Sequence, residues 1–181
     1  MNRKLVLFLA VIFSSYVGFA QLYSTSTAKV SFFSKTPIED INAETNTGLM
    51  VVNTQTQAIA FSITNTSFEF PNKLMQEHFN EKYMESEKFP KSTFAGKLSE
   101  PIDWTKDAEH TVNVVGKLNV HGVEKERTIQ GVIKIVNGVP HITSTFKVKN
   151  VDHNIQIPTI VVSKIAEEIE VKVAATLSPK K

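Results

Sequence analysis

Apolar and polar residues alternate with a period of two along most of this chain, as they do in strands that bury one face. The alternation is clearest in residues 110–120, 129–135 and 142–148. Turn residues separate neighbouring runs, and Asn137-Gly138 is the strongest tight-turn dipeptide among them, with a second turn at Gly122. Because hairpin-length connections join antiparallel strands, the pattern predicts an antiparallel sheet of about eight strands.

A sheet of eight strands must deal with two exposed edges, and closing it into a barrel removes both. Barrels of this size have an interior that is either filled by side chains or wide enough for one small apolar ligand. We therefore predict an all-β, antiparallel barrel with a lipocalin-like architecture. A two-sheet sandwich stays open as an alternative, because alternation alone does not distinguish the two.

Two irregularities are expected in the first half of the sheet. The polar stretch before Gly48 gives way to an apolar one after it, which favours a bulge or bend at this glycine. Ile59, Phe61 and Ile63 share one phase, whereas Phe68 falls on the opposite phase. A break in the strand is therefore expected at residues 65–67.

One helix is predicted after the third strand. Apolar residues recur at helical spacing over residues 72–87, Pro71 and Asn72 are suitable start residues, and Pro90 would stop the helix. An amphipathic helix must bury its apolar stripe on the sheet. We expect Phe79 and Tyr83, with Met84, to cover one end of the barrel, either as a gate or as a permanently packed element.

The first twenty residues differ from the rest of the chain. A basic start at Arg3 and Lys4 precedes an apolar run over residues 5–13, and Gly18-Phe19-Ala20 has the small-x-small pattern of a cleavage site. We predict a signal peptide over residues 1–20 and a single domain over residues 21–181. The mature protein would be periplasmic or secreted, and not integral to a membrane because no later apolar run is long enough.

Charge and motifs give little support to catalysis. The formal net charge is only +2 and the basic residues are scattered, so no nucleic-acid site is predicted. The chain has no Cys, and its five His residues lack a metal-binding spacing. A metal site would require His121, His141 and His153 to meet at one end of a barrel. No nucleophile motif is present. We predict no catalytic residue, no metal site and no cofactor, and we interpret Glu77, Glu81 and Glu85 as a solvated helix face.

Two passages resemble the signatures of the YceI-like family of secreted lipid- or polyisoprenoid-binding proteins. The first passage is the helix followed by an FPxxxF step, matched here by Phe89, Pro90 and Phe94. The second is a GxLxxxGVxKxxT hairpin, matched by the residues Gly116, Leu118, Gly122, Val123, Lys125 and Thr128. The resemblance covers the whole predicted mature chain and implies a lipocalin-type barrel with a lipid or isoprenoid tail inside.

The opening strands depart from the family pattern. The family often has a His in the stretch that corresponds to VSFFSKTPIEDINAETNTG, whereas this chain has Lys35 and Thr36 there and no His. This departure leaves the contacts of a ligand head group unassigned, and polyprenyl binding in particular does not follow from the resemblance.

The candidate ligand-binding residues are large apolar side chains that share strand faces or lie on the helix. Small residues expected to face inward beside them, including Ala60, Ser62, Ala95 and Gly96, would leave a narrow tube, although the same residues could interdigitate and fill it. The candidate set is Phe61, Ile63, Phe68, Phe79, Tyr83, Phe94, Val114, Leu118, Ile133 and Phe146.

Three functions follow from these observations. The first is an exported carrier or sequestering protein for a lipid, an isoprenoid or a quinone-like molecule, with no chemistry. The second is a small periplasmic enzyme whose site the sequence does not reveal. The third is a barrel with a solid core that binds a protein partner. A long apolar cavity would favour the first, and a polar cleft with converging His and carboxylate groups would favour the second.

Overall fold

The computed structural model describes residues 21–38, 40–158 and 165–180. The predicted signal peptide, residues 1–20, lies outside the described residues. No helix within the described ranges is long and apolar enough to cross a membrane.

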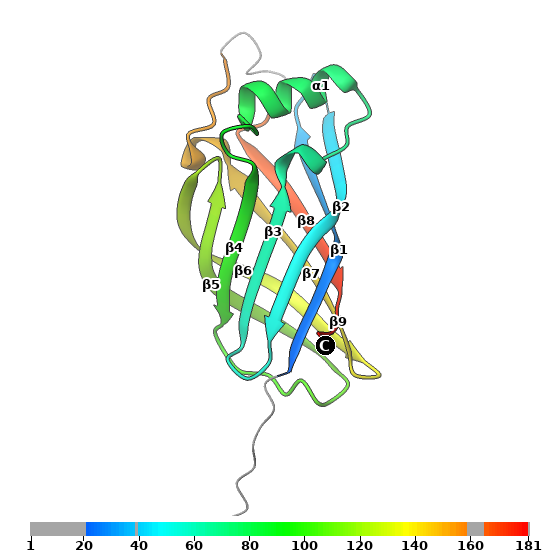
Figure 1. Cartoon of the computed structure of the whole chain (residues 1–181). Helices are drawn as coiled ribbons and strands as arrows, with labels where there is room; N and C mark the ends of the chain where they lie inside the picture. The colour runs from blue at the N-terminus through cyan, green and yellow to red at the C-terminus, as the bar shows by residue number, and fades with distance from the viewer. Residues whose placement is uncertain (1–20, 39, 159–164, 181) are drawn as a thin grey trace, which may run out of the picture.

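The described residues form one antiparallel sheet that closes on itself, as predicted (Figure 1). Neighbouring strands follow chain order from β2 to β8, β8 pairs with β1, and β1 pairs back with β2, so that eight strands complete a barrel. A ninth, two-residue strand adds to β1. The strands are β1 (Leu22–Lys35), β2 (Asp40–Asn53), β3 (Ala58–Thr64), β4 (Lys91–Leu98), β5 (Ala108–Val120), β6 (Val123–Val136), β7 (Val139–Lys149), β8 (Glu168–Thr176) and β9 (Ser178–Pro179).

Both predicted tight turns are present. In both turns the first central residue, His121 or Asn137, has a φ of 51°. The glycine that follows, Gly122 or Gly138, has a φ of 73°. Positive φ at both central residues is the geometry of two-residue hairpin turns that match the twist of the strands. These turns bring β5, β6 and β7 side by side.

The two predicted irregularities are confirmed. The β1–β2 register shifts on both sides of Ala28, whose partner across the ladder is Gly48. The third strand ends in a short 3₁₀ helix, η1 (Asn65–Ser67). The segment after η1 then pairs with the upper part of β2 through a two-way backbone bridge between Glu44 and Glu69.

The predicted helix is present but shorter than expected. It begins where predicted, because the Asn72 side chain accepts hydrogen bonds from the backbone N–H groups of Leu74 and Met75. The helix α1 (Lys73–His78) continues as a π-helical turn, η2 (Phe79–Tyr83), and ends well before Pro90.

The helix ends earlier than predicted because the chain leaves the helical conformation after Met84. Glu85 takes a left-handed conformation with φ of 42°, and the Ser86 hydroxyl donates to Asn80 Oδ1 over 2.7 Å. Glu85 is therefore not part of a solvated ladder with Glu77 and Glu81. Its carboxylate lies 2.7 Å from His121 Nε2 instead.

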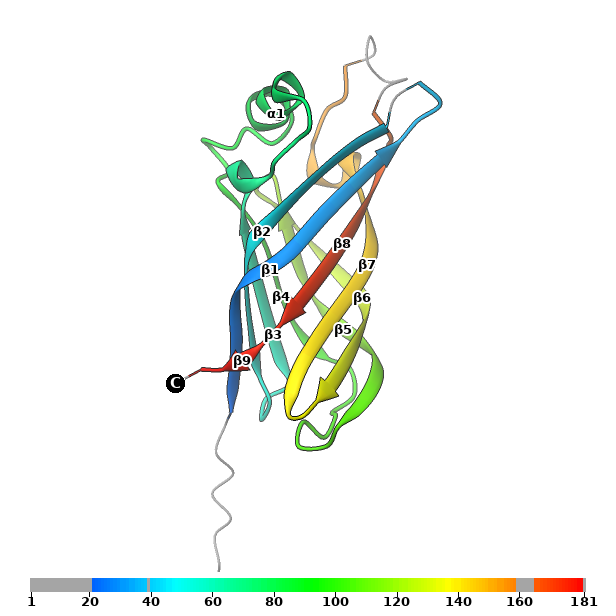
Figure 2. The same cartoon turned by 90° about the vertical axis from the view of Figure 1, so that its right-hand side faces the viewer.

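The helix lies across one end of the barrel, as Figures 1 and 2 show. We call residues 72–84 the lid, and the barrel end that they cover the lid end. The opposite end, the floor, is made of buried side chains that fill the barrel. Its members are Tyr23, Leu98, Trp104, Ile135 and Leu177.

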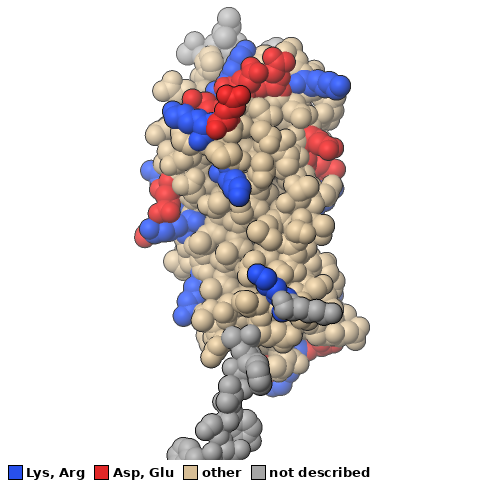
Figure 3. Space-filling view, viewed as in Figure 1, with Lys and Arg blue, Asp and Glu red and all other residues tan. Residues whose placement is uncertain are grey.

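Charged residues are distributed over the outside of the barrel. In Figure 3 acidic residues run along the lid with basic residues at either side, and the strands below carry scattered charges of both signs. Each of the ion pairs found joins side chains that are partly or fully exposed, apart from the pair that involves His121.

Candidate ligand-binding site

The barrel encloses a cavity of about 540 Å³ between the lid and the floor. Its wall consists largely of apolar side chains from all eight barrel strands and from the lid. The interior is not filled, so the alternative of a solid-core barrel is wrong. The described wall residues include no Asp, Glu, Lys or Arg.

All ten candidate residues line this cavity. The strand candidates do so because period two places them on the inward face. Phe79 and Tyr83 reach the cavity from the lid. That any of the ten contacts a ligand remains a prediction.

The prediction about small residues was partly wrong. Ala60 and Ala95 lie opposite each other on β3 and β4, and both are exposed on the outside of the barrel. They alternate with Ile59, Phe61 and Phe94, which face inward, so they belong to the outer phase. Ser62 shares that outer phase.

Sequence reasoning missed many wall residues. Most of them have the same period-two signal as the candidates and were simply not chosen, such as Val30, Phe32, Met50, Ile129, Ile142, Val148, Val171 and Val173. Polar wall residues gave no signal in the sequence. They include Ser34, Asn65, Asn72, His78, Ser92, Ser144 and Asn150.

Four phenyl rings join the lid to the barrel. The Phe32 ring lies 5.2 Å from Phe68, 5.6 Å from Phe70 and 5.4 Å from Phe79, measured between ring centroids. Phe79 in turn lies 5.7 Å from Phe68 and 5.1 Å from Phe70. Edge-to-face and offset contacts at these distances are favourable. The lid is therefore held against β1 and the η1 segment by an aromatic cluster.

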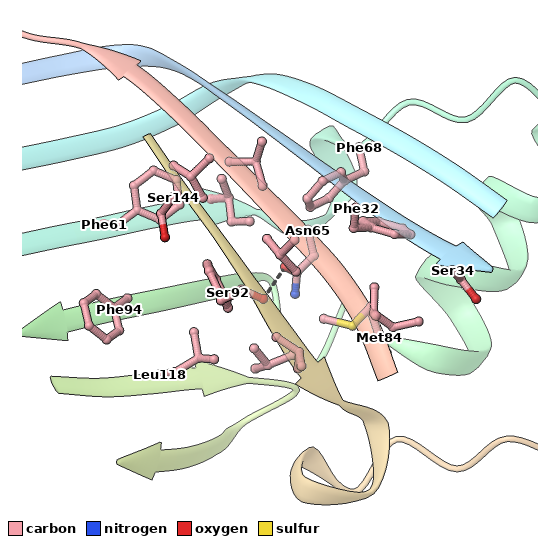
Figure 4. A pocket seen from close by; sticks show the side chains of 18 of the residues that line it. Phe32, Ser34, Phe61, Asn65, Phe68, Met84, Ser92, Phe94, Leu118 and Ser144 are labelled. Carbon is pink, nitrogen blue, oxygen red and sulfur yellow. Dashed lines mark hydrogen bonds between the residues drawn. The ribbon is translucent and has the colours of Figure 1, made fainter. Parts of the chain in front are cut away.

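A fully buried amide, Asn65, anchors the other side of the lid region. Its Nδ2 donates to the Phe89 carbonyl over 2.6 Å. Its Oδ1 accepts from the Ser92 hydroxyl over 2.8 Å, the bond drawn in Figure 4. The backbone N–H of Asn65 also donates to the carbonyl of Pro90. These contacts tie the end of β3 to the chain that returns from the lid.

Two further polar side chains hold the chain just before β8. The backbone N–H of Ala166 donates to Ser34 Oγ over 2.9 Å, and Asn150 Nδ2 donates to the Ala166 carbonyl over 3.0 Å. Ser34 and Asn150 both line the cavity at the lid end. Ser144 is a polar wall residue further down the strands, and its hydroxyl donates to the Gln130 carbonyl.

The β5–β6 turn contacts the end of the lid through His121. His121 Nε2 lies 2.7 Å from the Glu85 carboxylate and Nδ1 lies 3.1 Å from the His153 carbonyl. Both partners are acceptors, so both ring nitrogens must donate for the two hydrogen bonds to form together. The Phe89 ring packs on the His121 ring at 4.6 Å.

His153 lies beneath this turn and is fully buried. Its Nδ1 is 3.0 Å from the Val123 carbonyl, and Nε2 has no hydrogen-bond partner. Burial lowers the pKa of His153 below its usual value, because the charged imidazolium is poorly solvated there.

The three histidines that would have to meet to form a metal site are not all at one end of the barrel. His121 and His153 are neighbours at the lid end, but His141 begins β7 at the opposite end and bonds to Thr176. Within the described ranges, no group of three or more His, Cys, Asp or Glu residues is positioned to hold a metal ion.

A comparison with curated proteins gave no match. Solved structures of several proteins share the barrel fold described above. A solved polyisoprenoid binding domain from Saccharophagus degradans, implicated in plant cell wall breakdown, has a TM-score of 0.76 and 13% identity, covering 89% of this chain and 99% of that chain. BcnA from Burkholderia cenocepacia has a TM-score of 0.69 and 16% identity, covering 83% and 96%.

A third solved structure, the YCEI protein of Campylobacter jejuni, has a TM-score of 0.58 and 18% identity, covering 75% of this chain and 81% of that chain. At these identities the three structures establish the shared barrel fold. A model of the YceI-like domain matches residues 15–177, which is most of the sequence and includes both signature passages. This chain therefore belongs to the YceI-like domain family.

Proposed function

We propose that this protein binds one hydrophobic small molecule, a lipid or an isoprenoid-like or quinone-like compound, and carries or sequesters it without chemistry. The observation that carries this proposal is the apolar cavity of about 540 Å³ inside the barrel. A cavity of this volume is within the range of small-molecule sites, about 300–1,000 Å³. The polyisoprenoid binding named for the Saccharophagus degradans domain supports the same ligand class.

The wall chemistry favours a long apolar chain over a compact polar ligand. An aliphatic or isoprenoid chain needs apolar surroundings along its length and polar contacts at one end only. Each methylene that leaves water contributes about 0.8 kcal/mol, so a chain with several buried carbons binds usefully even after the cost of ordering it.

The distribution of polar wall groups gives the ligand an orientation. Ser34, Asn65, Asn72 and Asn150 line the cavity at the lid end, whereas its lower part is lined by apolar strand residues and Ser144. A polar ligand end would lie beneath the lid and the apolar tail would point to the floor. In this arrangement the lid is the gate through which the ligand passes.

The site of action follows from the N-terminal sequence. Residues 1–20 have the composition of a signal peptide, and we propose that export removes them and delivers the carrier to the periplasm or the exterior. N-terminal sequencing of the protein recovered from each cell fraction tests this. A chain that begins at Met1 in the cytoplasm would contradict it.

Binding is tested by organic extraction and native mass spectrometry of the purified mature protein. We expect a copurified hydrophobic compound at one molecule per chain. The matched variants are Ser144→Leu, which places a branched side chain inside the cavity opposite Gly131, and Thr143→Leu, which adds the same group to the outer face of β7. Ser144→Leu should lose the compound and Thr143→Leu should retain it.

Two results would contradict the proposal. One is a protein from which neither native mass spectrometry nor extraction recovers any hydrophobic compound, and to which added farnesol does not bind. The other is equal loading of both leucine variants. The gating role has its own test. If the lid is a gate, Phe79→Ser should accelerate farnesol release while the melting temperature changes comparatively little.

A further inference from the structure

Two phenyl rings of the wall lie over glycines instead of across the cavity. A Cβ placed on Gly48 would lie 3.0 Å from Cζ of Phe61, and a Cβ placed on Gly96 would lie 2.9 Å from Cζ of Phe94. Each ring tip therefore occupies space that the side chain of any other residue would need. The ring tips fit there because these two inward positions have no side chain.

The space beside the glycines is also limited by backbone. The same Cβ on Gly48 would lie 2.9 Å from the Ala28 carbonyl oxygen, and that on Gly96 would lie 2.8 Å from the Val115 carbonyl oxygen. A larger residue at either position would displace both the strand and the ring. Because both rings border the cavity, a displaced ring would move into it.

Phe61 and Phe94 form a pair at depth. They are direct partners across the β3–β4 ladder, and in Figure 4 they lie far from Phe32 and Met84, which mark the lid side. The cavity continues past them, because Ile59, two residues nearer the floor on β3, also lines it. The two rings therefore border the passage to the deep end of the cavity.

We propose that Phe61 and Phe94, held back over Gly48 and Gly96, determine the length of the apolar chain that this protein accepts. The inference rests on the proposed function and adds a specificity determinant to it. With both rings against the wall, a chain passes between them to the deep end. Removing a ring adds the volume of a phenyl group beside that passage and accommodates a longer chain.

The rings also cover glycine backbone, which is a purely stabilising role. Stability alone does not separate the two roles, because loss of either ring should lower it. Preference between chains of different length does separate them, since a covering role predicts no change in that preference.

The test measures binding of geraniol, farnesol and geranylgeraniol, which differ by one isoprene unit each, to the delipidated mature protein. We expect Phe61→Ala and Phe94→Ala to raise the affinity for geranylgeraniol relative to geraniol by about tenfold or more, which corresponds to burying about two further methylenes. Phe94→Leu should change the same ratio in the same direction by less, and it decides the test if the alanine variants do not fold.

The matched control is Phe70→Ala, which removes a ring of the aromatic cluster at the lid end. It should weaken all three alcohols by similar factors and leave their ratio unchanged. Binding by the wild type with an unchanged ratio in the Phe61 and Phe94 variants overturns this inference and leaves the proposed function standing. A wild type that binds none of the three alcohols overturns both.

Discussion

Different interactions stabilise the two ends of the barrel. Every buried polar or charged residue within the described ranges belongs to the lid end or to the strands around the cavity, namely Ser34, Thr45, Asn65, Ser86, His121, Asn150 and His153. The floor is made of apolar and aromatic side chains. Its two polar atoms are both bonded, because Trp104 Nε1 donates to Gln57 and the Tyr23 hydroxyl donates to the Gly138 carbonyl.

The cavity explains this difference. Where side chains fill the barrel, close packing supplies stability without directional contacts. Side chains that border the cavity have fewer protein neighbours, so the lid and the loops around it depend on hydrogen bonds that fix their position. Packing therefore closes the floor permanently, whereas a limited set of polar and aromatic contacts holds the lid.

The largest expected effect is on the floor. Ile135→Ala removes a buried side chain that does not border the cavity, and we expect it to lower the free energy of unfolding by about 4 kcal/mol. Ile142→Ala is the matched change in the cavity wall and should cost only about 2 kcal/mol, because Ile142 already lacks neighbours on one side. Urea unfolding of the ligand-free proteins measures both changes. Equal decreases in the free energy of unfolding would contradict the division into a packed floor and a cavity above it.

The next prediction concerns His153 and pH. Because burial lowers the pKa of this group in the folded state below its ordinary value of 6.5, the unfolded chain binds the proton more readily. The free energy of unfolding should therefore decrease as the pH falls below about 6.5. His153→Gln places a side chain that does not titrate at this position and should remove this part of the pH dependence. Urea unfolding measured above and below pH 6.5 tests this. An unchanged profile would show that other groups cause the acid sensitivity.

A smaller effect on stability is expected at the Tyr23 hydroxyl, one of the two polar atoms of the floor. Tyr23→Phe removes the hydroxyl that donates to the Gly138 carbonyl over 3.2 Å and leaves the ring in place. We expect a loss of about 1 kcal/mol in thermal or urea unfolding, with no change in farnesol affinity. A change in affinity would mean that the floor and the cavity are coupled.

The smallest effect on stability is expected at the end of the lid. Glu85→Gln weakens the contact with His121, and because the carboxylate is partly exposed we expect a loss of only about 0.5 kcal/mol. Release of bound farnesol should nevertheless become faster, since this contact holds the lid. Glu81→Gln, an exposed change on the same segment, is the control. Stopped-flow displacement measures release, and equal rates for the two variants would contradict a holding role for Glu85.

Much of the barrel could be predicted because strand patterns and turns are local properties. Asn137-Gly138 specifies a tight turn by its own backbone preferences, and Gly48 marks the bulge as a glycine within a strand pattern. The candidate wall residues were placed correctly because period two assigns a whole strand to one face at once. Ala60 and Ala95 were misplaced where this rule was not applied.

The end of the helix could not be predicted, because its cause is not local. Apolar spacing continues past Tyr83, but Glu85 turns away and its carboxylate meets His121 from a turn 36 residues later in the chain. The separation of His141 from His121 and His153 likewise depends on which end of the barrel each strand begins at.

The sequence by itself determined the strands, their inward faces, the turns, the start of the lid and the family. Only the tertiary structure decided that a cavity lies above the floor, where the lid ends and which polar groups surround the cavity. The physical reason is that a cavity is a small difference between the volume of a closed sheet and the volume of the side chains inside it. That difference depends on contacts such as Phe61 over Gly48, between residues on separate strands, and no local pattern reports them.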